Sequence, residues 1–77
     1  MSKLNKAFDK AKEIAQQNKN ENGQMRFTYT QCLGFLYLQG VLEDGEVSSV
    51  ENYLSSKNTD IDIIGNLLEA NEIIGIN

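Results

Sequence analysis

Hydrophobic residues recur at steps of three and four along most of the chain, and polar breaks divide the pattern into four segments. This period is typical of amphipathic α-helices. The first segment, residues 4–15, carries a narrow stripe rich in alanine, which permits close approach to a neighbour but buries little area per residue. Ser2 is placed to cap this helix. The small buried area leaves two alternatives open, an N-terminal helix that packs in the bundle and one that docks late or frays.

The second segment, residues 29–42, is apolar around almost the whole circumference of a helix. Thr28 and Gln31 have the spacing of a capping box, which places the helix start at residue 29. Because a helix that is apolar on every side is a buried one, we expect it at the centre of the fold, wrapped by the other helices and by a second copy of the chain. Gly34 and Gly40 lie inside it and indicate either places where another backbone comes close or weak positions that the helix tolerates.

Two further helices are predicted after a glycine-containing turn. The third runs from Glu46 to about Ser56, with Asp44 as its cap. The fourth begins after Thr59, which forms a capping box with Asp62, and acidic residues in its first turn suit the helix dipole.

The pattern as a whole predicts an all-α fold with one domain, residues 1–77. The helices form a small orthogonal or up-down four-helix bundle, or three helices with a loosely docked N-terminal one. Apolar residues alternate in Met25–Phe27, and the tail Ile73–Ile76 is rich in β-branched residues. These patterns leave one alternative open, a minor β-bridge between the two segments.

Length and composition narrow the function classes. The 77 residues include no histidine, no tryptophan and one cysteine, which removes the imidazole base, the usual zinc ligand sets and an internal disulfide. A chain of this size builds one core and has no room for a separate substrate-binding domain. We expect a protein that is not an enzyme, with no catalytic residue, no cofactor and no metal site.

Local patterns that mimic functional sites are incomplete. Residues 18–23 have asparagines and a glycine at the first positions of an EF-hand loop, but Tyr29 replaces the glutamate that calcium requires. The lone Cys32 is interpreted as a small buried hydrophobe in a reducing compartment. Lysines interrupt any N-terminal secretory signal, and no apolar stretch reaches the roughly 18 residues of a membrane span. The expected location is cytoplasmic, with no membrane partner.

Charge is distributed unevenly along the chain. Residues 1–26 hold six bases and three acids, a balance of +3, whereas residues 27–77 hold one base and eight acids, a balance of −7. An acidic surface repels nucleic acid and attracts basic protein surfaces, mainly by raising association rates. The alternative is that the acidity only confers solubility.

The favoured hypothesis is a small acidic helical protein that acts by protein–protein interaction, as an adaptor or inhibitor of a larger protein with a basic surface. In size and charge, though not in any motif, it resembles small proteins of bacteriophages and mobile elements that disarm host enzymes. The residues predicted to bind the partner are Glu43, Asp44, Glu46, Glu51 and Tyr53.

A second hypothesis is a homodimeric regulatory or structural protein that associates through the helix of residues 29–42. In this hypothesis the lysine-rich N-terminal helix contacts nucleic acid, through Lys3, Lys6, Lys10 and Lys12. The other helices present acids to a polyanion, which disfavours nucleic-acid binding elsewhere on the chain.

Overall fold

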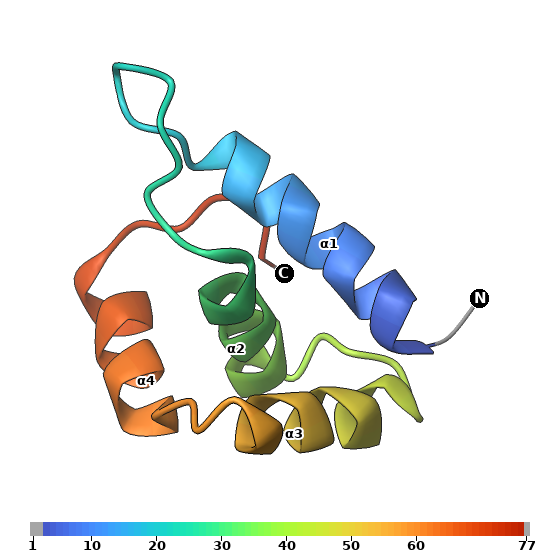
Figure 1. The fold of residues 1–77 in the computed structure, drawn as a ribbon. Helices are drawn as coiled ribbons and strands as arrows, with labels where there is room; N and C mark the ends of the chain where they lie inside the picture. The colour runs from blue at the N-terminus through green and yellow to red at the C-terminus, as the bar shows by residue number, and fades with distance from the viewer. Residues whose placement is uncertain (1–2, 77) are drawn as a thin grey trace.

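The computed structural model describes residues 3–76, which form four α-helices joined by short turns and one longer loop (Figure 1). The helices are α1 (Lys3–Gln17), α2 (Tyr29–Gln39), α3 (Glu46–Ser56) and α4 (Ile61–Ala70). Helix α2 lies in the middle and packs against the other three, and α1 also packs against α3. The predicted all-α bundle around a central second helix is confirmed.

Helix α2 begins where its local sequence predicts. Both hydrogen bonds of the capping box are present: the Gln31 N–H donates to Thr28 Oγ1 at 3.1 Å, and the Thr28 N–H donates to Gln31 Oε1 at 2.9 Å. The helix ends at Gln39 and not near residue 42, because Gly40 adopts a left-handed conformation with φ 68° and caps it. Gly40 is therefore a helix terminator, and the interpretation of it as a backbone contact point inside the helix is wrong.

The core is built around the buried face of α2. Buried residues from every helix and from the long loop contribute, and the largest of them is Phe35. Phe27, in the loop before α2, meets Phe35 edge to face with ring centroids 5.1 Å apart. The hydrophobic core comprises Ala7, Ala11, Ile14, Ala15, Phe27, Cys32, Leu33, Phe35, Leu36, Val50, Leu54 and Ile64.

Helix α1 packs against α2 and α3, so of the two predicted arrangements the structure has the one with four packed helices. Its three buried alanines let its backbone approach α2 closely, and Ile14 adds a larger buried side chain. Phe8 extends the contact to α3, where its ring meets Tyr53 edge to face at 5.0 Å. Small side chains thus give a close interface here and not a weak one. Ser2, the predicted cap, lies outside the described residues.

Helix α3 begins at Glu46 as predicted, but the caps of α3 and α4 each lie one residue later than predicted. The residue before α3 is Gly45, with φ 88° and no side-chain cap, so Asp44 is too early in the chain to act as one. Before α4, Asp60 Oδ1 accepts hydrogen bonds from the backbone N–H groups of Asp62 and Ile63, at 2.9 and 3.3 Å. Asp60 therefore replaces Thr59 as the cap of α4.

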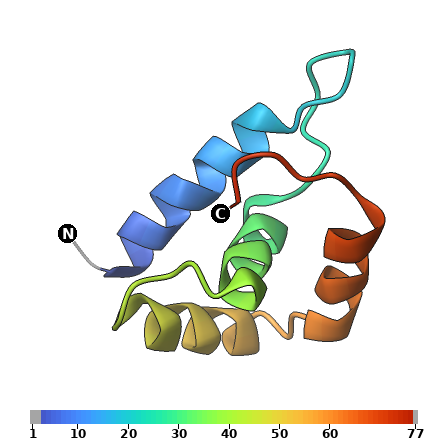
Figure 2. The same cartoon turned by 180° about the vertical axis from the view of Figure 1, so that it is seen from behind.

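The C-terminal tail returns to the end of α1 (Figure 2). Asn18 is buried there and binds the backbone of Ile74 in both directions: its side-chain amide donates to the Ile74 carbonyl at 2.8 Å and accepts from the Ile74 N–H at 2.9 Å. Met25 instead forms an isolated antiparallel bridge with Lys19. The predicted bridge between Met25–Phe27 and Ile73–Ile76 is therefore wrong, because a side chain occupies the tail's hydrogen-bonding groups.

Gly34, one of the two glycines predicted to mark a close approach, does lie at a close contact between helices. A β-carbon on Gly34 would lie 2.6 Å from a methyl carbon of Ile64, so α2 and α4 approach through this point. The neighbour is a side chain and not a backbone as expected.

None of the helices within residues 3–76 has both the length and the apolar character needed to cross a membrane.

Candidate functional site

The five residues predicted to bind a partner do not form one surface. Glu43 and Asp44 are exposed on the turn between α2 and α3, but Glu46 is buried. Glu51 contacts Tyr37 of α2, while Tyr53 faces the other way, toward α1. The structure therefore separates the predicted set into exposed acids and packing residues.

Glu46 joins the turn before α3 to α1. Its side chain is only 1% exposed, and its Oε1 accepts hydrogen bonds from Lys10 Nζ at 3.0 Å and from the backbone N–H of Glu43 at 2.9 Å. Burial raises the pKa of Glu46, but the Glu43 N–H and the charges of Lys10 and Lys6 outweigh it and hold the pKa below its usual value. Glu46 is thus a charged structural residue and is not available to a partner.

The lysines predicted for nucleic acid share this region of α1. Lys10 is paired with Glu46, and Lys6 is close enough to stabilise the same carboxylate. The side chain of Lys3 lies against Gly45, where a β-carbon would collide with it. Three of the four predicted lysines therefore face the acidic turn between α2 and α3, whereas Lys12 is exposed elsewhere on the helix.

Tyr53 is half-buried in the contact between α1 and α3. One side of its ring meets Phe8, and the ammonium of Lys57 lies 5.7 Å from the ring centroid. These contacts make Tyr53 a packing residue, so it is not a free aromatic anchor.

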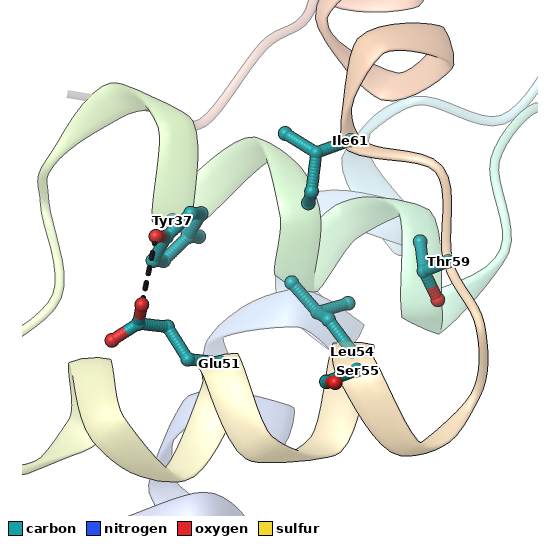
Figure 3. Close-up of a pocket in the computed structure, with 6 residues that line it drawn as sticks. All are labelled: Tyr37, Glu51, Leu54, Ser55, Thr59 and Ile61. Carbon is teal, nitrogen blue, oxygen red and sulfur yellow. Dashed lines mark hydrogen bonds between the residues drawn. The ribbon is translucent and has the colours of Figure 1, made fainter.

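A hollow lies between the end of α2, the side of α3 that faces α2, and the start of α4 (Figure 3). Its volume is about 280 Å³. Tyr37 and Glu51 lie at one end and Thr59 at the other, and Leu54, with Ser55 beside it, and Ile61 lie between them. The residues that line this hollow, called here the α3 pocket, are Tyr37, Glu51, Leu54, Ser55, Thr59 and Ile61.

The polar end of the α3 pocket is organised by one hydrogen bond. The Tyr37 hydroxyl donates to Glu51 Oε2 at 3.1 Å. This bond and the adjacent negative charge raise the pKa of Tyr37, so the phenol remains protonated and a donor at neutral pH. Glu51 itself is exposed and forms no ion pair within residues 3–76. The pocket therefore carries a carboxylate that keeps its charge available.

A second, smaller hollow of about 180 Å³ lies between α1, the end of α2 and the tail. Its charged groups are Lys10 and Glu13, and Lys10 is already bonded to Glu46. The rest of its lining is Ile14, Leu36, Val41 and Gly75, so the hollow combines charged and apolar groups.

The loop that mimics a calcium site and the lone cysteine both have structural roles. Asn20 Oδ1 accepts the backbone N–H groups of Asn22 and Gln24, which closes the loop that resembled a calcium site. Cys32 is buried, and burial raises the pKa of its thiol to about 11, which leaves it protonated at neutral pH. Within residues 3–76, no cluster of three or more histidine, cysteine, aspartate or glutamate side chains is placed to hold a metal ion.

No protein-family model, curated protein or solved structure matched the chain when it was compared with them.

Proposed function

We propose that the chain is a non-enzymatic binding protein that attaches, as an adaptor or inhibitor, to the basic surface of a larger protein. The attachment surface is the acidic edge, defined as Glu43, Asp44, Glu51, Asp60 and Asp62. All five residues are exposed, and they lie before α3, on α3 and at the start of α4.

The observation that carries this proposal is the unequal use of charge. Lys10 is paired with the buried Glu46, whereas no residue of the acidic edge forms an ion pair within residues 3–76. With a formal net charge of −4, and with one base and eight acids in residues 27–77, the chain carries most of its negative charge in the part that contains α3 and α4. Such a field attracts basic surfaces and raises the rate of association.

Binding to immobilised arginine-rich peptide, lysine-rich peptide and random-sequence duplex DNA, at increasing salt, tests the proposal. We expect binding to the basic peptides that weakens as salt rises, because exposed charges are screened over about 10 Å at 0.1 M salt. Binding to DNA and not to the peptides would contradict the proposal and favour a role for the lysines of α1.

A matched pair of double variants separates recognition from general acidity. Glu43→Lys with Glu51→Lys changes the acidic edge, while Asp9→Lys with Glu21→Lys changes the net charge equally on α1 and the long loop. We expect the first pair to lose most of the peptide binding and the second to retain it. Equal losses would show that the acidity acts only through net charge, as a solubility role predicts.

A further inference from the structure

The α3 pocket is polar at both ends and apolar in the middle (Figure 3). Its polar groups are all oxygens: the Glu51 carboxylate and the hydroxyls of Tyr37, Ser55 and Thr59. None of the described residues that line it is a lysine or arginine. The ligand that complements it has an apolar stem and a cationic end with several hydrogen-bond donors.

Resting on the function proposed above, we infer that the α3 pocket receives the side chain of one arginine of the partner protein. The aliphatic stem lies over Leu54 and Ile61, and the guanidinium donates to the Glu51 carboxylate at the end of the pocket. The hydroxyls of Ser55, beside Leu54, and of Thr59, at the opposite end, face the backbone of the partner.

Three properties favour arginine over other occupants. Its planar group has five donors and stacks on aromatic rings, which suits a site formed by Glu51 and the ring of Tyr37. Lysine offers a compact charge that does not match a flat ring and a carboxylate together. The hollow of about 280 Å³ is at the lower end of the volumes that ligands occupy, roughly 300 to 1,000 Å³, which is compatible with a single side chain.

Amide chemical shifts of the full chain, measured during titration with capped tripeptides, test this inference. The peptides are Gly-Arg-Gly, Gly-Lys-Gly and Gly-Gln-Gly. We expect the arginine peptide to shift the amides of Glu51, Ser55, Thr59 and Ile61 along a saturable curve. The lysine peptide gives weaker shifts at the same amides, and the glutamine peptide gives none.

Two variants and one control sharpen the test. Glu51→Gln removes the charge but keeps the size of the side chain, and it is expected to weaken arginine-peptide binding about fivefold. Thr59→Val removes a hydroxyl from the opposite end and gives a smaller loss. Glu21→Gln, which removes the same charge in the long loop, leaves binding unchanged. Thermal melting of each variant confirms that it is folded.

The inference is overturned if arginine and lysine peptides bind equally, if shifts spread over the acidic edge without including the pocket, or if Glu51→Gln binds as wild type does. Free arginine that shifts these amides as strongly as the peptide also overturns it, because the site then takes a small molecule. None of these results touches the proposed function, which fails separately if the charge-reversed acidic edge still binds basic peptides.

Discussion

Two glutamates of the same short helix have opposite environments. Glu46, at the start of α3, is buried and paired with Lys10, while Glu51, farther along, is exposed and bonded only to the Tyr37 hydroxyl. A buried charge must be compensated inside the protein, so Glu46 is committed to holding α1 against the turn before α3. An exposed charge without a cation remains available, so Glu51 is suited to recognition. Identical side chains on one helix are thus divided between stability and binding by what packs against them.

The largest expected effect comes from breaking the core that both regions share. Leu36→Asp places an unpaired charge on the buried face of α2 and is expected to cost more than about 4 kcal/mol, which removes the folded state. Leu38→Asp, on the exposed part of the same helix, is the matched control and should cost less than about 1 kcal/mol. Circular dichroism and urea unfolding measure both. A folded Leu36→Asp variant of normal stability would contradict the central position of α2.

The second prediction compares the loss of stability when Glu46 and Glu51 are each replaced by alanine. Glu46→Ala leaves Lys10 and the Glu43 N–H without their acceptor and is expected to lower the free energy of unfolding by about 2 kcal/mol. Lys10 is 39% exposed, so water limits the loss. Glu51→Ala is expected to stay within about 0.5 kcal/mol of wild type. Equal losses in urea unfolding would show that the two carboxylates are not divided as described.

The pH dependence of stability provides a third test. The pKa of Glu46 is lower in the folded chain than its usual value, so the folded state favours the carboxylate. The stabilisation is complete above the usual glutamate pKa, about 4.3, and is lost as the pH falls through the lowered pKa. Wild type should therefore lose stability on acidification below about pH 4.3, and Glu46→Gln should lose less over this range. Parallel curves for the two proteins would contradict the ion pair.

The smallest expected effects test the packing of α4, which supports the α3 pocket. Gly34→Ala would bring a β-carbon within 2.6 Å of Ile64 and is expected to cost about 1 kcal/mol. At Gly65 a β-carbon has only an ordinary contact, 3.8 Å from Leu38, so Gly65→Ala should stabilise the chain by up to about 1 kcal/mol through helix propensity. Thermal unfolding measures whether each variant is less or more stable than wild type. The same sign for both variants would contradict the close approach of α2 and α4.

The parts of the fold that sequence predicts well are local. The capping box of α2 lies entirely within Thr28 to Gln31, so its hydrogen bonds depend on neighbours along the chain. The burial of Glu46 depends on Lys10, which is distant in sequence and reaches it only after α1 docks. The role of Asn18 as a holder of the tail has the same origin, because Ile74 lies at the other end of the chain.

One part of the candidate site was accessible to sequence reasoning. Residues two apart on a helix do not face the same way, so Glu51 and Tyr53 belong on different sides of α3. Their grouping into one surface follows from nearness in sequence and disregards this spacing. The α3 pocket itself was not accessible, because it requires the packing of α2, α3 and the start of α4 against each other.

The most direct measurement of the central claim uses an arginine-rich peptide that carries a nitroxide spin label. Nitroxides broaden the amide signals of nearby residues, so the broadened signals show which face the basic partner covers. We expect the strongest broadening along α3 and the start of α4, with weaker broadening along α1, which packs against α3. Broadening centred on α1, or spread evenly over the whole chain, would contradict the claim that the unpaired acids of α3 and α4 form the binding surface.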